Sequence, residues 1–390
     1  MATKRRMLRL FLKLGLGVVG LIVLLVGGLV AYVGFKKRQF TEMPDTHDLR
    51  ERIEKLAGSY LGARTNGGLV IGVIQQSQRF VKGYGRVSEA NAAPPDAATL
   101  FEIGSVTKVF TAVTLAGMVL DGKVKLEDPI TFYLPKEVTN RGLAPITLRH
   151  LATHTSGLPR LPENFDAVSK DEADPYADYR AADLYRCLNA LPPRKTRAKK
   201  PDYSNLGFGL LGHILELAAG KPYEQLVQET ICLPLGMSNT AIRLSEEQKK
   251  RLSPGHDAQG AVVPGWGFDV LAPAGAFRSN GDDLLKFLAA NLAGADSKIS
   301  KALQVSHKTR FESWEGAIGL GWQLTETVED LKIFWHNGGT GGYVSFIGFD
   351  ADHQTGVVIL SNYGDAFAQD DLVDRMAMAV LRLAAKVSLN

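Results

Sequence analysis

The stretch Ser105-Val106-Thr107-Lys108 decides how this 390-residue chain is interpreted. It places a hydroxyl and an amine three residues apart, at the start of an apolar stripe from Ser105 to Leu120 that predicts a helix. Residues three apart share a helix face, so the amine of Lys108 can reach the oxygen of Ser105. Serine needs such a neighbour before it attacks an acyl carbon. The pattern recurs by chance in unrelated proteins, so its interpretation as a nucleophile depends on the residues that follow.

Two later segments have matching chemistry in the expected order. Tyr203-Ser204-Asn205 follows a Pro-bearing loop and precedes a helical pattern, so it predicts a phenol and an amide held by a rigid helix. The run from Trp335 to Gly342, with the sequence WHNGGTGG, lies between two predicted strands. Its glycines allow backbone N–H groups to approach a ligand closely.

Together these segments resemble the three motifs of the serine beta-lactamase and penicillin-binding-protein superfamily, S-x-x-K, Y-x-N and K/H-x-G. Longer stretches are also similar: LRHLATHTSGLP at 148–159, YSNLGFGLLGHILE at 203–216, LPLGM at 233–237 and the terminal hairpin at 336–362. The branch that the chain resembles holds class C beta-lactamases, DD-peptidases and family VIII esterases. Its landmarks run in order from about Leu69 to Asn362.

The resemblance implies a role for each motif residue. Ser105 is the nucleophile, and Tyr203 is the base that takes its proton and later activates the hydrolytic water. Lys108 is buried beside both, and its charge favours the phenolate. The remaining expectations concern binding. Asn205 donates to a substrate amide carbonyl and holds Lys108, and the N–H groups of Ser105 and Gly339 form the oxyanion hole. Gly338 takes part in the oxyanion hole and substrate binding, and His336 begins the third motif.

The residue patterns and the resemblance predict the same fold class, an α+β beta-lactamase/transpeptidase-like domain. Strands at 69–74 and 79–86 pair early in the chain, and strands at 319–324, 331–335, 343–349 and 356–360 follow late. Helical patterns at 48–61 and 367–386 flank this antiparallel sheet, and residues 120–300 supply an inserted, mostly helical region. The domain is expected to span residues 48–390, after a linker at 39–47.

Residues 1–38 predict a cytoplasmic basic tail and a transmembrane signal anchor. Leu14 to Phe35 is free of charge and, as a helix, would span ~33 Å, enough to cross a bilayer. The span is too long for a signal-peptide core, and five basic residues precede it while three follow. We therefore expect a single-pass protein of the cell inner membrane, held by residues 14–35, with its catalytic domain in the periplasm.

Composition excludes several other classes. The net charge is +4, but residues 1–38 carry eight basic and no acidic residues, which leaves −4 for the remainder and predicts no nucleic-acid binding. The sequence contains no metal-ligand cluster or nucleotide-binding pattern, so we expect no metal and no cofactor.

Cys187 and Cys232 are interpreted as buried free thiols, with a disulfide as the alternative. Ser156, the rival nucleophile, has no base three or four residues later and is interpreted as a loop-pinning residue.

Two departures from the family pattern bear on the substrate. His336 stands where class C beta-lactamases carry lysine, so a group that titrates near neutrality replaces a permanent cation. The basic run at 194–200 lies on the approach to Tyr203, either as a solvated face or as an electrostatic rim for anions.

We expect a serine hydrolase that cleaves an amide or ester in a small molecule or peptide, through an acyl-enzyme on Ser105. A D-amino-acid peptide is the first substrate considered, and a family VIII-like carboxylesterase or a slow scaffold protein are the alternatives.

Overall fold

The computed structural model describes residues 48–62, 64–192, 201–294, 296–313, 316–328, 330–364 and 372–389. The predicted tail and anchor at 1–38, the linker at 39–47 and the whole basic run at 194–200 lie outside the described residues. Among the helices that are described, none is long and apolar enough to cross a membrane.

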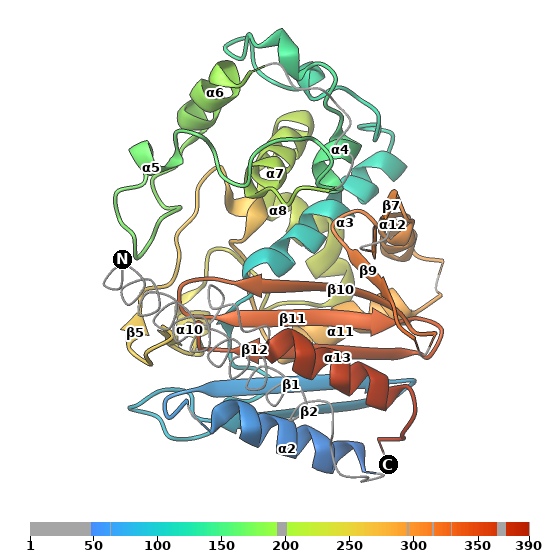
Figure 1. Ribbon diagram of the computed structural model, residues 1–390. Coiled ribbons are helices and arrows are strands. Elements are labelled where there is room, and N and C mark those ends of the chain that lie inside the picture. Colours follow the sequence, from blue (N-terminus) through green and yellow to red (C-terminus); the bar gives the residue numbers. More distant parts are fainter. Residues whose placement is uncertain are drawn as a thin grey trace, which may run out of the picture. The chain divides into compact units, whose positions relative to one another are not determined.

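An eight-stranded antiparallel sheet forms the lower half of the molecule (Figure 1). Its strands, in spatial order, are β2 (Gln78–Gly85), β1 (Gly68–Gln75), β12 (Thr355–Ser361), β11 (Val344–Asp350), β10 (Lys332–Gly339), β9 (Gln323–Glu326), β8 (Gly316–Ile318) and β7 (Phe311–Ser313). The register joins Leu69 to Tyr84 on one side and to Ser361 on the other, so the two ends of the chain share the sheet. The predicted early hairpin is confirmed to within one residue at each end, and the late strands predicted at 331–335, 343–349 and 356–360 correspond to β10, β11 and β12. The strand predicted at 319–324 is wrong over 319–322, which connect β8 to β9.

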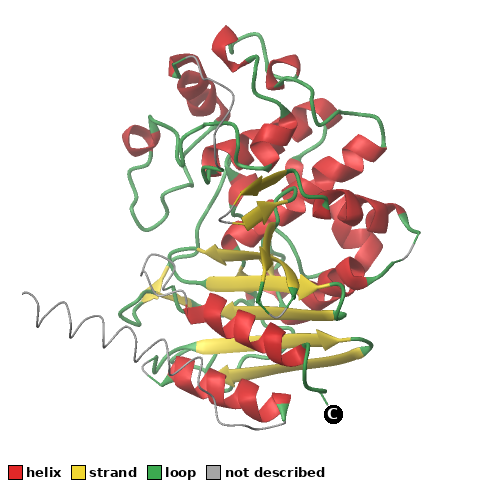
Figure 2. Cartoon of the chain, turned by 45° about the vertical axis from the view of Figure 1, so that its right-hand side comes forward, coloured by secondary structure: helices red, strands yellow, loops and turns green. Residues whose placement is uncertain are grey.

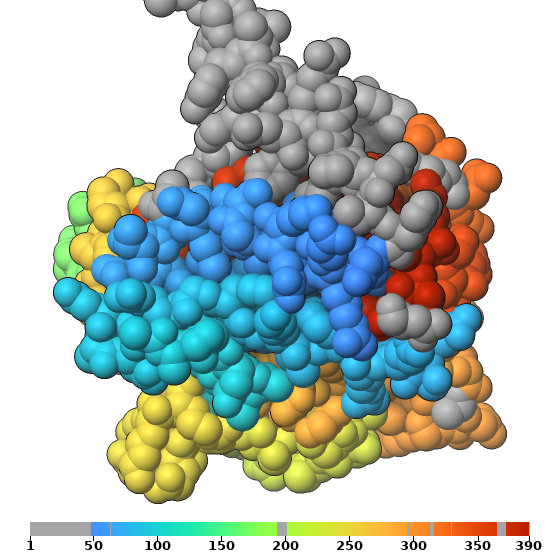
Figure 3. Space-filling model, turned by 90° about the horizontal axis from the view of Figure 1, so that it is seen from below, coloured from blue at the N-terminus to red at the C-terminus, as the bar shows by residue number. Residues whose placement is uncertain are grey.

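Helices cover both faces of this sheet. α2 (Leu49–Leu61) and α13 (Leu372–Ala384) lie on one face, and α11 (Gly281–Leu292) packs on the other against β1, β11 and β12 (Figures 1 and 2). Asp48 caps α2 by accepting from the N–H groups of Arg50 and Glu51, which explains why the helix begins there. The view from below shows residues from about 50 to 100 as a continuous band across the surface (Figure 3).

The inserted region is helical, as predicted, and lies above the sheet in Figure 1. It comprises α3 (Thr107–Leu120), α4 (Leu148–Ala152), α5 (Phe165–Val168), α6 (Ala181–Ala190), α7 (Asn205–Ala219), α8 (Tyr223–Val227), α9 (Leu233–Leu235) and α10 (Glu246–Lys249); α12 (Lys298–His307) follows α11 and packs on α3. The fold is therefore the predicted α+β arrangement of an antiparallel sheet, terminal helices and a helical insertion.

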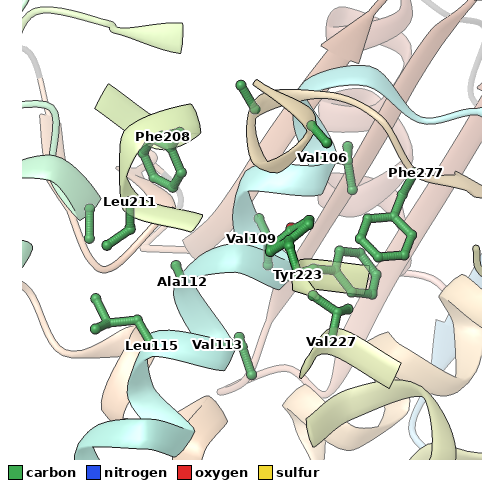
Figure 4. Packing of buried hydrophobic residues seen from close by; sticks show 14 of the residues in the cluster. Val106, Val109, Ala112, Val113, Leu115, Phe208, Leu211, Tyr223, Val227 and Phe277 are labelled. Atoms are coloured by element: carbon green, nitrogen blue, oxygen red, sulfur yellow. The ribbon is translucent and has the colours of Figure 1, made fainter. Parts of the chain in front are cut away.

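Two features of α3 differ from the prediction. All residues from Thr107 to Met118 are buried, so the helix is enclosed on every side instead of presenting one apolar stripe. Figure 4 shows why: Phe208 and Leu211 of α7 pack on one side, while Tyr223 and Val227 lie near another. The α-helix also begins at Thr107, because Ser105 belongs to a preceding 3₁₀ turn, η1 (Gly104–Val106).

Candidate active site

Ser105 lies in a tight turn between a short strand and the buried helix. β3 (Phe101–Glu102) leads into η1, where Gly104 has φ +47°. A Cβ atom on Gly104 would lie 2.6 Å from the backbone nitrogen of Gly339 in β10, so only glycine allows this approach. Ser105 lies in this turn, and Lys108 lies three residues later in the first turn of α3. Residues three apart in a continuous helical segment share one side, so the Lys108 amine can reach Ser105 Oγ.

Two polar side chains meet at the Ser105 hydroxyl. Lys108 Nζ lies 2.8 Å from Ser105 Oγ and donates to the Ala274 carbonyl at 2.6 Å. The Tyr203 hydroxyl donates to Ser105 Oγ at 2.7 Å. Lys108 also lies 4.8 Å from the centre of the Tyr203 ring. The first two motifs, 98 residues apart in the sequence for Ser105 and Tyr203, are thus joined through one oxygen atom.

Burial moves both ionisable partners of Ser105 towards their neutral forms. Desolvation, with the positive charge of Arg160 second, lowers the pKa of Lys108 well below its ordinary 10.5. Desolvation raises the pKa of Tyr203 above its ordinary 10. The expectation that the Lys108 charge favours a Tyr203 phenolate is therefore wrong for the free enzyme. A buried neutral amine can accept a proton, and a buried phenol keeps its own.

The second motif starts α7, and its amide differs from expectation. Ser204 caps the helix by accepting from Gly207 N, and Asn205 is its first residue. The Asn205 amide donates to the Tyr176 hydroxyl at 3.0 Å and makes no hydrogen bond to Lys108. The Ala274 carbonyl holds Lys108 in its place. Asn205 Oδ1 is buried without a partner, so this amide retains hydrogen-bonding capacity for a substrate.

The third motif lies within β10 instead of in a loop between strands. β10 continues through Gly339, where Gly338 and Gly339 pair with Ser345 and Val344 of β11. A Cβ on Gly338 would lie 2.1 Å from the Ile103 carbonyl and 2.9 Å from Ser105 N. The strand thus runs against η1, and the backbone nitrogens of Ser105 and Gly339, the expected oxyanion-hole donors, both lie at this junction.

His336 precedes that junction and is uncharged. Its side chain is 1% exposed, and Nδ1 lies 2.6 Å from the Asn337 carbonyl, which it reaches as an N–H donor. Desolvation, with the Lys108 charge second, lowers the pKa of His336 to about 3. The expectation that this group titrates near neutrality is therefore wrong, because a buried imidazole beside a lysine is hard to charge.

Comparisons with known proteins show the family to which the chain belongs. The family model described as Beta-lactamase matches residues 53–381, which is most of the chain. The chain belongs to the beta-lactamase family. It is 29% identical over 349 residues to a beta-lactamase of Pseudomonas fluorescens, covering 81% of this chain and 94% of the relative. It is 30% identical over 314 residues to the D-alanyl-D-alanine-carboxypeptidase/endopeptidase AmpH of Escherichia coli strain K12, covering 75% and 78% of the two chains.

Solved structures of this family share the fold. A class C beta-lactamase in complex with cefoxitin matches with a TM-score of 0.75 and 22% identity, over 86% of this chain and 98% of the other. A beta-lactamase/D-alanine carboxypeptidase from Pseudomonas syringae matches with a TM-score of 0.73 and 22% identity, over 86% and 98%. Members of the beta-lactamase family are serine hydrolases, so the prediction of an enzyme of this class is confirmed.

Two residues that surround the beta-lactamase-family site were not predicted as part of it. His154 lies against the Tyr203 ring, with 4.6 Å between ring centres, and its Nδ1 accepts from Ser204 N at 3.1 Å. Arg160 lies over the same ring, 5.1 Å from its centre. Sequence offered one signal for both: they belong to or directly follow the LRHLATHTSGLP stretch. Beside Tyr203 is a cavity of about 210 Å³, lined by His154, Pro201, Tyr203, Ile318, Gly321, Trp322, Gln323 and His336.

Other candidate residues have structural surroundings. Ser156 Oγ accepts from Leu158 N at 3.3 Å and pins its own loop. Cys187 and Cys232 are both buried free thiols, and burial raises the pKa of Cys232 to about 12. Within the described part of the chain, no group of three or more His, Cys, Asp or Glu side chains is placed to hold a metal ion.

Proposed function

We propose that this chain is a membrane-anchored serine hydrolase that cleaves an amide or ester bond through an acyl-enzyme on Ser105. One observation carries the proposal: Ser105 Oγ lies within hydrogen-bonding distance of both Lys108 Nζ and the Tyr203 hydroxyl. The nucleophilic oxygen of Ser105 thus lies beside a base, Lys108, and a proton donor, Tyr203, near the backbone nitrogens expected to form the oxyanion hole.

The acylation step follows from the pKa directions. Ser105 Oγ attacks the acyl carbon, and its proton passes to the amine of Lys108, whose lowered pKa favours the neutral form that can accept it. The N–H groups of Ser105 and Gly339 stabilise the oxyanion. The Tyr203 hydroxyl then gives its proton to the leaving amine or alkoxide, and the acyl–leaving-group bond breaks. This step leaves a protonated Lys108 beside a Tyr203 phenolate.

Deacylation restores the starting state. The Tyr203 phenolate takes a proton from water, and the hydroxide formed in that step attacks the acyl carbon. Ser105 Oγ leaves and recovers its proton from Lys108. The predicted role of Tyr203 as activator of the hydrolytic water is thus kept, while Lys108 replaces it as the base of the first step. All protons balance within these three side chains, so no cofactor is required.

We assign D-amino-acid peptides as the substrate class. The named activity of AmpH, a D-alanyl-D-alanine carboxypeptidase and endopeptidase, supports this assignment, as does the D-alanine carboxypeptidase named for the Pseudomonas syringae structure. Asn205 also supports it, because its unpartnered buried oxygen can accept from a peptide N–H of the substrate.

A hydrolysis screen with covalent labelling tests the proposal. The wild-type protein is expected to cleave a D-alanyl-D-alanine peptide and to form an adduct with penicillin that intact-mass spectrometry detects. Ser105→Ala should abolish both, while Ser156→Ala, which removes the neighbouring buried hydroxyl, should keep them. Full labelling of the Ser105→Ala protein would overturn the assignment. Cleavage of p-nitrophenyl esters alone would instead favour a carboxylesterase.

The anchor and the location form a separate part of the proposal. The charge-free run at 14–35, with five basic residues before it, supports a cytoplasmic N-terminus and a periplasmic catalytic domain in the inner membrane. Deletion of residues 1–38 should release an active protein into the soluble fraction. A reporter enzyme fused to the C-terminus should be active only in the periplasm, and cytoplasmic reporter activity would reverse the orientation.

A further inference from the structure

Arg160 is a cation at the active site that the catalytic steps do not use. The Pro159–Arg160 backbone is fixed to the second motif: Ser204 Oγ donates to the Pro159 carbonyl, and the N–H groups of Asn205 and Leu206 both donate to the Arg160 carbonyl. The guanidinium lies over the Tyr203 ring, 5.1 Å from its centre. Ser105 is bonded to the hydroxyl of that same ring, so a single phenol separates Arg160 from the nucleophile.

Its guanidinium has donors to spare. Arg160 is exposed, and the structure gives its side chain no hydrogen bond and no ion pair to any described residue. Other arginines of the described chain have acidic partners: Arg278 is paired with Glu102, Arg149 with Glu127 and Arg180 with Asp269. A guanidinium offers five N–H donors in a planar fork that matches a carboxylate. The backbone of Arg160 is therefore fixed at the site, while the N–H donors of its guanidinium are not used by any described residue.

The ionisable groups around the nucleophile include no carboxylate. Those that act on Lys108, His154, Tyr176, Tyr203 and His336 are Arg160, Lys108, His336 and Tyr176. Lys108 is buried and its Nζ is engaged with Ser105 Oγ and the Ala274 carbonyl. His336 is buried and neutral, so among these described groups Arg160 is the positive charge that a ligand can reach.

We propose that Arg160 determines substrate specificity by binding a carboxylate that lies a few bonds from the scissile carbonyl. This inference rests on the proposed function, because it names the charge that the hydrolysed amide or ester carries. The ligand would hydrogen-bond to the guanidinium while its acyl carbon lies at Ser105. The same geometry suits a leaving group that carries the carboxylate, since Tyr203, the proton donor for the leaving group, lies between Arg160 and Ser105.

Two matched substrate pairs test it in the full-length protein. The first is a D-alanyl-D-alanine peptide with a free carboxylate and the same peptide as a carboxamide. The second is 3-acetoxybenzoate and its methyl ester, which differ in the charge of the leaving group alone. The variants are Arg160→Ala, Arg160→Lys and, as a control, Arg141→Ala, an exposed arginine elsewhere in the chain.

We expect the wild type to prefer the carboxylate member of at least one pair. Arg160→Ala should reduce that preference in kcat/KM by about ten- to a hundredfold, the range for one hydrogen bond to a charged group, and mainly through KM. Arg160→Lys should keep part of the preference, because it keeps the charge but loses the fork. Arg141→Ala should keep all of it, and high salt should reduce the preference in the wild type.

The outcomes separate this inference from the proposed function. Equal losses on both members of a pair in Arg160→Ala, or a wild type without preference, would overturn the role of Arg160 and leave the Ser105 chemistry standing. A wild type that hydrolyses none of the four compounds and takes no penicillin label would overturn the proposed function, and this inference with it. Thermal melting of each variant shows whether the fold is retained.

Discussion

The burial of His336 predicts how the stability of this protein depends on pH. The unfolded chain takes up a proton on this imidazole near pH 6.5, whereas the folded chain does so only near its lowered pKa of about 3. A depressed pKa means that the group's contribution to stability is fully present above pH 6.5. It is lost as the pH falls from 6.5 towards 3, because the unfolded state then binds a proton that the folded state refuses.

The size of the effect follows from the two pKa values. Each pH unit in this window removes about 1.4 kcal/mol from the free energy of unfolding, so the roughly 3.5 units between them amount to about 5 kcal/mol. That is a large part of the ~5–15 kcal/mol that stabilises a typical domain. The side chain is 1% exposed, so solvent screening reduces the effect little.

His336→Gln removes this titration and keeps a polar side chain. We expect the free energy of unfolding, measured by denaturant titration at pH 6.5 and 4.5, to fall more steeply in the wild type than in the variant. The difference in slope should amount to about 3 kcal/mol across those two units. Parallel curves for the two proteins would refute the reasoning. So would a His336 proton resonance that titrates near pH 6.5, or a kcat/KM inflection at that pH that disappears in His336→Gln.

Further predictions concern the chemistry and the junction of strand and turn. Lys108→Ala should slow acylation by about a hundredfold or more, seen as slower adduct formation with penicillin, and an unchanged rate would exclude it as the base. Tyr203→Phe should accumulate acyl-enzyme with a p-nitrophenyl ester, because the nitrophenolate leaves without a proton while deacylation still needs Tyr203. A steady-state rate equal to that of the wild type would contradict this. Gly338→Ala should lower kcat more than tenfold, because its Cβ would meet the Ile103 carbonyl at 2.1 Å. His307→Gln should make the protein less sensitive to acid in thermal melts above about pH 4, since burial lowers the pKa of His307 to about 4.

Features with a local signature were predicted well. The first hairpin was predicted because apolar runs flank a polar turn, and α2 because apolar residues recur at helical spacing over 48–61. Ser105, Lys108 and Tyr203 were brought together in advance only through the family resemblance, since no local pattern reports a contact across 98 residues. The structure provides the distances that make the grouping chemically specific.

Features that depend on tertiary surroundings were not predicted. The sequence of α3 shows one apolar stripe, but its other faces are covered by segments from α7, α8 and α12, which periodicity in α3 alone does not reveal. The partner of Lys108 is the carbonyl of Ala274, and any residue type can supply a carbonyl. The third motif was predicted between two strands, with glycines that allow a ligand to approach the backbone, whereas here Gly338 and Gly339 belong to β10 and allow it to run against η1.

The charge state of the site depends on how deeply its ionisable groups are buried, which the sequence alone does not show. Three ionisable groups next to the nucleophile, Lys108, Tyr203 and His336, are all driven towards neutrality by desolvation. A site of neutral groups is stable without a substrate, because it leaves no buried charge without a partner. In the mechanism proposed for this site, charge appears on Lys108 and Tyr203 only after acylation, as an adjacent pair whose opposite signs stabilise each other. The permanent charge of Arg160 lies at the exposed edge, where water solvates it until an anionic substrate arrives. In this site, therefore, Arg160 recognises the substrate by its charge, whereas Lys108 and Tyr203 transfer the protons.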